Sequence, residues 1–227
     1  MLPCQLNIAI DGPAGAGKSS VARAVAQALG LIYLDTGAMY RAITWKALKL
    51  QVPLTDANAL GELTAGSEFC WGGPNGAPEL CMDGEPLPAA IRSQEVTSQV
   101  SLVASYEEVR KELRQKQREL GKGRGVVMDG RDIGTVVMPA AALKIFLTAS
   151  LEERAERRLK ELGQDSSLLP QMMQAMARRD HKDASRQHSP LSIAPNATII
   201  DTTGLSLSQV VDLVIWHARQ VCLSEGE

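Results

Sequence analysis

The chain has few aromatic residues and almost no net charge. Aromatic side chains make up 4% of its 227 residues. It has 24 basic and 26 acidic side chains, which gives a formal net charge of −2. Without a broad basic field, neither nucleic acid nor an anionic membrane surface is an expected partner, and any anion must be bound by a local cluster of residues. We therefore expect small molecules as partners and a monomeric chain.

Closely spaced cysteines are also missing. The four cysteines lie far apart and form no C-x-x-C pair: Cys4, Cys70, Cys81 and Cys222. In a reducing compartment we expect them to be free thiols or small core residues. Only Cys70 and Cys81 are candidates for neighbours on paired strands.

No run of apolar residues is long enough to suggest a membrane span. The best candidate, residues 133–151, is interrupted by Pro139 and Lys144, and it fits a loop followed by a strand better. The N-terminal apolar run lacks a basic flank and is too short for a signal peptide. We expect the protein to stay in the cytoplasm.

What the sequence does contain is a glycine-rich segment, DGPAGAGKSS, at residues 11–20. It fits the pattern G-x-x-x-x-G-K-[ST], in which backbone N–H groups surround a phosphate, the lysine reaches the terminal phosphates and the hydroxyl ligates Mg²⁺. An apolar run at 6–10 predicts a strand before it, and residues 18–29 predict a helix after it, ended by Gly30. The alternative is a flexible turn between two elements.

We therefore predict a site for a nucleoside triphosphate with Mg²⁺. The expected cofactor contacts come from one continuous segment: Gly12, Pro13, Ala14, Gly15, Ala16, Gly17, Lys18, Ser19 and Ser20. The motif alone does not separate kinases, GTPases and motor ATPases, because all of them use this phosphate cradle.

Five short apolar runs alternate with helical stretches: residues 6–10, 31–35, 125–129, 143–147 and 197–201. Runs of this kind indicate strands buried on both faces of a parallel sheet. We predict an α/β fold, a P-loop NTPase core with a five-stranded parallel sheet and flanking helices. Ligands of such sheets bind at the carboxyl ends of the strands.

Two stretches interrupt this alternation. Residues 66–88 contain two short β-like runs and two turn signals, which predict a small antiparallel sheet. Residues 150–195 predict two exposed, charged helices, typical of a lid. We expect one domain over residues 1–227, with a β-rich insert at about 62–105 and a helical lid at about 150–195. Residues 94–120 predict helix with a break near 104–106.

Several charged residues fall near predicted strand ends. Arg41 falls in the first turns of the helix after the strand at 31–35 and could bind a phosphate bidentately, although a solvated surface charge is the alternative. Thr36, at the end of that strand, could be only an N-cap. Asp129 suits Mg²⁺, either directly or through water, but could equally begin a turn. Arg131 and Asp132 in GRDIG suit phosphate and base, with a simple ion pair as the alternative.

The lid contains a second charged group. Arg179, Asp183 and Arg186 are spaced by four and three residues, so a helix places them on one face. A ladder of salt bridges within that helix is the alternative explanation.

In this order along the chain, the motifs IDGPAGAGKSS, YLDTGAMYRA, IRSQEV, DGRDIGTVV, LKIFLTAS, ARRDHKDASR and IIDTT resemble those of the bacterial cytidylate kinases (CMP/dCMP kinases) over nearly the whole length. The resemblance implies transfer of the γ-phosphoryl group of ATP to CMP and dCMP, and it implies that the β-rich insert at about 62–105 binds the monophosphate. The alternatives are a P-loop kinase for UMP or a metabolite alcohol, and a regulatory GTPase, although no guanine-reading N/T-K-x-D segment is present.

The resemblance also implies roles for individual residues. Four positions match contacts to the phosphate of the monophosphate: Thr36, Arg41, Arg131 and Arg186. Three match readers of cytosine, namely Ser101, Arg110 and Asp132, and Arg179 and Asp183 match a lid pair near the sugar and phosphates. With Lys18, the arginines Arg131, Arg179 and Arg186 form the expected catalytic set, and Ser19 and Asp129 the expected metal ligands.

The sequence departs from the family pattern at a few positions. Position 36 is often serine and is threonine here, and SPL at 189–191 replaces a usual APL. Position 182, commonly a lid arginine, is Lys182, which offers a point charge instead of a two-pronged donor. This last change affects how strongly the lid binds phosphate.

Overall fold

The computed structural model describes residues 6–72 and 79–224. The chain forms two compact units, one made of Met1–Tyr33 and Arg124–Glu227 and the other of Leu34–Gly123. The first of the two turns predicted within residues 66–88, the GGPNGA stretch at residues 72–77, lies almost entirely outside the described residues. The bounds expected for the insert and the lid stay predictions.

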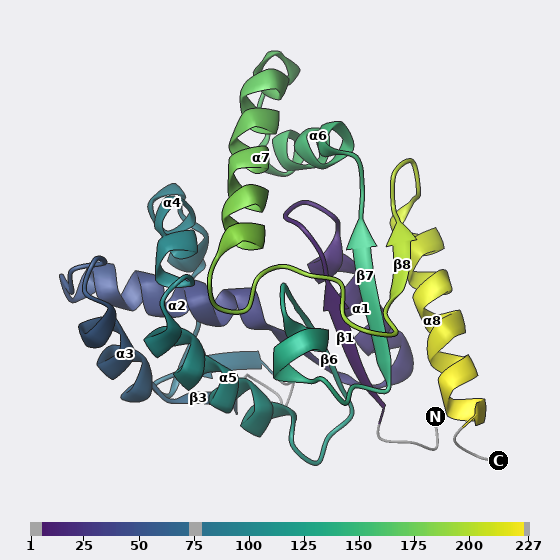
Figure 1. Cartoon of the computed structure of the whole chain (residues 1–227), viewed down its shortest axis with the longest axis horizontal. Coiled ribbons are helices and arrows are strands. Elements are labelled where there is room, and N and C mark those ends of the chain that lie inside the picture. Colours follow the sequence, from purple (N-terminus) through teal and green to yellow (C-terminus); the bar gives the residue numbers. More distant parts are fainter. Residues whose placement is uncertain (1–5, 73–78, 225–227) are drawn as a thin grey trace. The chain divides into compact units, whose positions relative to one another are not determined.

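The first unit is built on a parallel sheet (Figure 1). Its strands lie in the order β2-β6-β1-β7-β8, with β1 paired in parallel to both β6 and β7, and β7 to β8. The bounds are Ile32–Asp35 (β2), Val126–Gly130 (β6), Asn7–Asp11 (β1), Leu143–Thr148 (β7) and Thr198–Asp201 (β8). The predicted five-stranded sheet is therefore confirmed, with each strand within one residue of its predicted bounds.

Helices of the first unit cover the sheet and extend beyond its carboxyl edge. They are α1 (Lys18–Leu29), the short π-helix η3 (Ile133–Val137), α6 (Leu151–Leu162), the 3₁₀ turn η4 (Ser166–Leu168), α7 (Leu169–Ser185) and α8 (Leu207–Ser224). The two charged helices predicted for residues 150–195 are thus confirmed as α6 and α7, which pack against each other (Figure 1).

One hydrophobic core holds α1 and α8 against the sheet. Alternate residues of the strands, such as Ile8, Ile10 and Ile145, are almost fully buried and meet apolar side chains from one face of α1 and of α8. Burial of a large aliphatic side chain stabilises a fold by about 1.5–3 kcal/mol, so this core fixes β1 and α1, the two elements that flank the glycine-rich segment. As predicted, α1 ends at Gly30, whose φ of 68° is left-handed.

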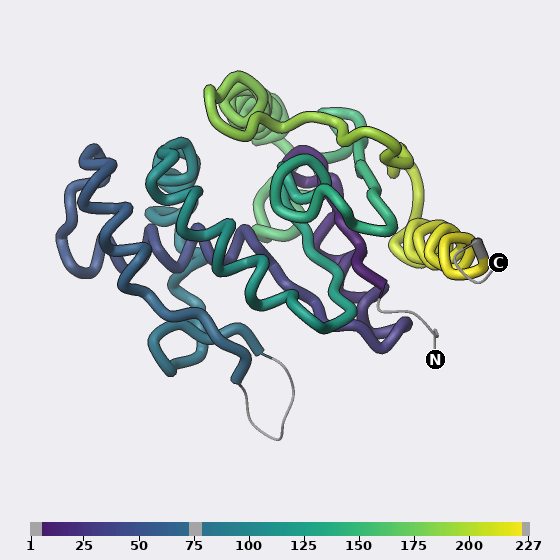
Figure 2. The backbone as a smooth tube through the Cα atoms, turned by 60° about the horizontal axis from the view of Figure 1, so that its bottom comes forward, coloured from purple at the N-terminus to yellow at the C-terminus, as the bar shows by residue number. Residues whose placement is uncertain are grey.

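The second unit combines helices with a small antiparallel sheet. Its elements are α2 (Thr36–Lys49), α3 (Ala57–Ala65), β3 (Phe69–Gly72), β4 (Glu79–Met82), β5 (Glu85–Pro86), the 3₁₀ turn η2 (Ala89–Arg92), α4 (Gln94–Val103) and α5 (Glu107–Gly121). β4 pairs with β3 and β5, and α3 lies beside α5 (Figure 2). The small sheet and the helix break near 104–106 are both confirmed.

The bonding state of the cysteines was predicted only in part. Cys70 and Cys81 are free and lie opposite each other on β3 and β4, as predicted. Cys222, on α8, is in a disulfide, so the expectation of a free thiol is wrong there. Across residues 6–72 and 79–224, no helix combines the length and the apolar character that a membrane crossing would need.

Candidate active site

The glycine-rich segment forms the loop between β1 and α1, and its backbone explains its composition. Gly12, Gly15 and Gly17 have φ values of 146°, 76° and 85°, a region that other residues rarely adopt. A Cβ atom on Gly12 would lie 2.0 Å from the carbonyl oxygen of Leu147, so no larger residue fits there. The loop ends at the N-terminus of α1, where free N–H groups and the helix dipole favour an anion.

Lys18 is the first residue of α1 and is buried. Its Nζ donates a hydrogen bond to the carbonyl oxygen of Pro13, 2.7 Å away across the loop. Burial, together with the positive charges of Arg131 and Arg179, lowers the pKa of Lys18 to about 7, while Asp129 acts in the opposite direction. A bound anion would stabilise the charged ammonium group, so this side chain is suited to a phosphate.

Ser19 and Asp129 meet at the carboxyl end of β6. The Oγ of Ser19 donates to Oδ2 of Asp129 at 2.8 Å, and the hydroxyl of Tyr33 donates to Oδ1 at 2.9 Å. Asp129 therefore lies within a strand and the turn alternative is wrong. Tyr33, whose ring lies 5.3 Å below the guanidinium of Arg23, was missed by the sequence reasoning, because only the fold brings it to Asp129.

The Ser19 and Asp129 side chains suit Mg²⁺. Hydroxyl and carboxylate oxygens are the hard donors that Mg²⁺ prefers, and this ion keeps several waters or phosphate oxygens in its shell. Among the residues described, no group of three or more His, Cys, Asp or Glu side chains is placed to hold a metal. Two protein oxygens beside a phosphate-binding loop therefore fit an ion that arrives with a nucleotide better than a closed structural metal site.

Arg131 connects the loop after β6 to helix α7. Its Nε donates to Oδ2 of Asp183 at 2.9 Å, and Arg186 lies 3.9 Å from the other oxygen of that carboxylate. Burial raises the pKa of Asp183, but the nearby guanidinium groups of Arg131 and Arg179 outweigh it and hold the pKa below its usual value. Asp183 thus pairs with Arg131 on another element and, more distantly, with Arg186 three residues along the chain, so one pair of the alternative ladder is also present.

The other two arginines that the sequence assigned to a lid, Arg179 and Arg186, differ in their surroundings. Arg179 is largely buried, its pKa is lowered by burial and by Arg131, and its Nε has no hydrogen-bond partner among the described residues. Arg186 donates from Nε to the carbonyl oxygen of Ser189 at 2.7 Å. Because α7 ends at Ser185, Arg186 lies just beyond the helix face on which the spacing had placed it.

A further residue that the sequence reasoning missed joins helices α6 and α7 to the glycine-rich loop. Arg154 on α6 is 7% exposed and donates from Nη1 both to the carbonyl oxygen of Ala14, at 3.1 Å, and to Oδ2 of Asp180 on α7, at 2.6 Å. Met176 of α7 packs so closely that a Cβ on Gly15 would lie 2.7 Å from its methyl group. These contacts connect parts of the chain 140 residues apart, and no local pattern marks them.

The second unit contains four of the predicted residues on three helices. Arg41 of α2 donates to Oγ1 of Thr97 on α4 at 2.8 Å, and Ser101 lies one turn further along α4. Arg110 of α5 is 1% exposed, donates to the carbonyl oxygen of Ala104 at 3.0 Å and lies 5.4 Å from the centre of the Tyr40 ring. Arg41 is therefore not a solvated surface charge.

Thr36 begins α2 but does not cap it. The residue before it, Asp35, accepts a hydrogen bond from the N–H of Ala38 at 2.8 Å and is the N-cap. The alternative of Thr36 as an N-cap is therefore wrong. Its side chain is buried at the start of the helix.

Comparison with known proteins adds independent information. The sequence profile of the family described as cytidylate kinase matches residues 8–220. The chain is 49% identical over 220 residues to the cytidylate kinase of Shouchella clausii (94% of this chain, 98% of the relative), and 47% identical over 219 residues to that of Bacillus subtilis (95% and 97%). A solved structure of an uncharacterized protein from Eubacterium ventriosum shares the fold, with a TM-score of 0.54 and 12% identity over 96% of this chain and 99% of that one.

A second group of relatives is longer. The chain is 49% identical over 224 residues to a protein of a Synechococcus strain named bifunctional pantoate ligase/cytidylate kinase. That match covers 96% of this chain but 41% of the relative, so the chain spans about two fifths of such proteins.

Proposed function

Because the chain belongs to the cytidylate kinase family, we propose that it transfers the γ-phosphoryl group of ATP to CMP and dCMP, giving CDP and dCDP. The observation that carries this proposal is the loop between β1 and α1 with Lys18 buried at its end. Burial and two arginines lower the pKa of the Lys18 ammonium group to about 7, so positive charge is concentrated around it. Such a place favours a ligand that carries several negative charges.

The donor side uses the loop amides, Lys18 and the Ser19–Asp129 pair. Phosphoryl transfer passes through a loose, in-line transition state, so the protein mainly positions the groups and neutralises charge. Ser19 and Asp129 would hold Mg²⁺, which when bound neutralises charge on the terminal phosphates of ATP. The acceptor phosphate is already an anion at neutral pH, so no general base is required.

The residues that we assign to the acceptor, CMP, are those that the family resemblance implies. Thr36, Arg41, Arg131 and Arg186 bind the phosphate of CMP, and Ser101, Arg110 and Asp132 select its base. Arg179 and Asp183 act from the lid near the sugar and phosphates. The buried Nε of Arg179, without a partner among the described residues, supports this role, because a buried donor is costly unless a ligand accepts its hydrogen bond.

The lid has a physical reason to close during the reaction. An open site would allow water to attack ATP, and closure strengthens every charge interaction inside by excluding water. The ion pair of Arg131 with Asp183 joins α7 to the loop after β6, and Arg154 of α6, which pairs with Asp180 of α7, also donates to the carbonyl oxygen of Ala14 in the glycine-rich loop. We further propose a monomeric, cytoplasmic enzyme that binds only small molecules.

The test is an assay of ADP release with purified protein, Mg²⁺ and ATP across all nucleoside monophosphates. CMP and dCMP should give the highest kcat/KM, with UMP clearly lower. A chain that prefers UMP, or that needs a metabolite alcohol as acceptor, would replace the proposal with one of the other P-loop kinases. Removal of Mg²⁺ with a chelator should abolish turnover in the same assay.

A further inference from the structure

The small sheet of the second unit contains two free cysteines on neighbouring strands. Cys70 is on β3 and Cys81 is on β4, and the antiparallel register places the two residues directly opposite each other. Opposite residues of such a strand pair project to the same face of the sheet, so both thiols lie on one face. The proposed kinase reaction assigns no role to either thiol.

Contacts at the end of the strand pair where β3 begins and β4 ends fix this register. Lys46 of α2 donates from Nζ to Oγ of Ser67, shortly before β3, at 2.8 Å and to Oδ2 of Asp83, directly after β4, at 2.7 Å. Asp83 also bonds twice to Glu68: its N–H donates to the carbonyl oxygen of Glu68 at 2.8 Å, and its Oδ1 accepts from the N–H of Glu68 at 2.9 Å. A slip of one residue would break these bonds, so the two cysteines stay opposite each other.

The general spacing of opposite residues suits a disulfide. Opposite Cα atoms in an antiparallel pair lie about 4.5–5.5 Å apart, and a disulfide joins Cα atoms that are about 4.4–6.8 Å apart. Opposite Cβ atoms are about 4.5–5.5 Å apart, whereas a disulfide needs about 3.5–4.5 Å, so closure must draw the two strands slightly together. A disulfide that departs from relaxed geometry is more easily reduced, which favours a reversible bond over a permanent one.

The sulfur atom of Cys81 already lies against the strand that contains Cys70. Gly72 follows Cys70 on the same face of β3, and a Cβ on Gly72 would lie 2.6 Å from Sγ of Cys81. The absence of a side chain at Gly72 therefore leaves the room that this sulfur occupies. The Cys81 thiol donates only a weak hydrogen bond, to the carbonyl oxygen of Glu79 at 3.7 Å, so little opposes a rotation toward Cys70.

The two thiols differ in their access to solvent. Cys70 is exposed, whereas Cys81 is 3% exposed, since it lies on the central strand between Cys70 and Pro86 of β5. Burial raises the pKa of the Cys81 thiol, and the neighbouring Cys70 raises it further. A reagent from solution therefore meets Cys70 first, and Cys81 is held close enough to react in a second step.

We propose that Cys70 and Cys81 form a redox modification site that exchanges with low-molecular-weight disulfides of the glutathione type. The thiolate of Cys70 attacks one sulfur of the reagent and forms a mixed disulfide, while the other half of the reagent leaves as a thiolate. The thiolate of Cys81 then attacks Sγ of Cys70, which forms the cross-strand bond and releases the second half. The two protons lost by the cysteines pass to the two released thiolates, so the reagent disulfide is reduced as the protein disulfide forms.

The test treats the purified wild-type protein with oxidised glutathione, alkylates the remaining thiols without reduction, and maps each cysteine by digestion and mass spectrometry. We expect peptides linked through Cys70 and Cys81, lighter by the mass of two hydrogen atoms than the two reduced peptides. Dithiothreitol added to the folded protein should make both thiols available to alkylation again. A stable glutathione adduct on Cys70 beside a free Cys81, dimers linked through Cys70, or no reaction would each overturn the inference.

Two serine variants separate the roles of the thiols. In Cys81→Ser, glutathione should stay attached to Cys70, because the thiol that would displace it is missing. In Cys70→Ser, Cys81 should react at least about tenfold more slowly than Cys70 reacts in Cys81→Ser, since only local opening exposes it. Equal rates would contradict the assignment of Cys70 as the attacking thiol.

The wild-type mapping needs no variant, so it decides the inference even if a serine variant does not fold. It also needs no nucleotide, so a protein that fails to phosphorylate CMP but forms the Cys70–Cys81 bond would refute the proposed function alone. An active kinase in which the bond does not form would refute the redox site alone.

Discussion

Two loops at the carboxyl edge of the sheet reach their conformations by different means. The loop after β1 is shaped by its own backbone, because Gly12, Gly15 and Gly17 have left-handed φ values. The loop after β6 is held from outside: Gly134 has no such φ value, and its amide is fixed by Asp11, 123 residues earlier. The glycine spacing of the first loop predicts its conformation, whereas the GRDIG motif of the second loop does not reveal that Asp11 fixes its backbone.

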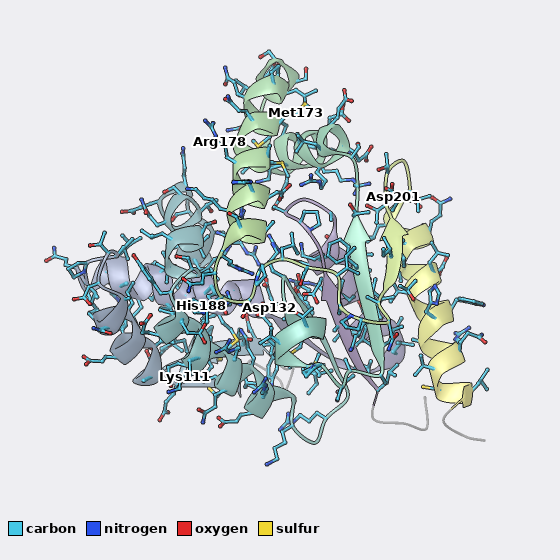
Figure 3. All side chains as sticks on the ribbon, viewed as in Figure 1. Lys111, Asp132, Met173, Arg178, His188 and Asp201 are labelled. Atoms are coloured by element: carbon cyan, nitrogen blue, oxygen red, sulfur yellow. The ribbon has the colours of Figure 1, made fainter. Side chains whose placement is uncertain are left out.

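The largest effect is expected from the first loop. In Lys18→Met, kcat should fall by about two orders of magnitude or more, because the lysine charge is needed most as the phosphoryl group moves. The melting temperature should not fall, since a buried charge is removed. Steady-state kinetics and a thermal melt check both, with Lys111→Met, an exposed position on α5 (Figure 3), as the control. A near-normal kcat would refute the assignment of this loop.

Substitution in the second loop should change selectivity more than turnover. A carboxylate at Asp132 accepts a hydrogen bond from the amino group of cytosine but faces the carbonyl oxygen of uracil. In Asp132→Asn we therefore expect the ratio of kcat/KM for CMP over UMP to fall about tenfold or more, with KM for ATP unchanged. The measurement is kinetics with both acceptors, and Asp165→Asn, an exposed aspartate with a local hydrogen bond, is the control. An unchanged ratio would assign base selection to Ser101 and Arg110.

The two ends of the first loop should affect stability in opposite senses as the pH changes. The native pKa of Lys18, about 7, is below its ordinary value of 10.5, so between these pH values the unfolded chain binds the extra proton and stability rises with pH. Burial raises the pKa of Asp11 from 3.8 to about 6, so there the native state binds the extra proton and stability falls as the pH rises. Each slope is at most about 1.4 kcal/mol per pH unit.

Urea unfolding at a series of pH values measures these slopes. In Lys18→Met, the free energy of unfolding should no longer rise with pH above pH 7 but should still fall as the pH increases toward 6. In Asp11→Asn, the rise above pH 7 should remain and the fall below pH 6 should disappear. Identical pH profiles for wild type and both variants would show that neither group titrates as its burial implies.

The smallest effect is expected at Arg186, beyond the end of α7. Arg186→Lys keeps the charge but removes the two-pronged donor, and kcat should fall about fivefold if the residue binds phosphate. A purely structural ion pair would instead cost at most about 0.5 kcal/mol of stability. Arg178→Lys is the control, because Arg178 is an exposed arginine of the same helix (Figure 3). Normal kinetics with slightly lower stability would support the structural alternative.

The sequence by itself determined the elements and the donor loop. Alternating apolar runs and helical stretches predicted the five-stranded sheet, and the spacing of Gly12, Gly17, Lys18 and Ser19 predicted a phosphate loop, because backbone conformation and amphipathic periodicity depend on neighbouring residues. The small sheet of the second unit and the break between α4 and α5 were predictable for the same reason.

Only the tertiary structure decided which charged residues meet. Asp183 pairs with Arg131, Arg154 joins Ala14 to Asp180, Tyr33 holds Asp129, and Asp11 caps η3. The partners in these contacts are 26 to 140 residues apart, so no local spacing encodes them. Hydrogen bonds and ion pairs depend on distance in space, and the parallel pairing of β1 with β6 and β7 is what brings these residues to one edge of the sheet.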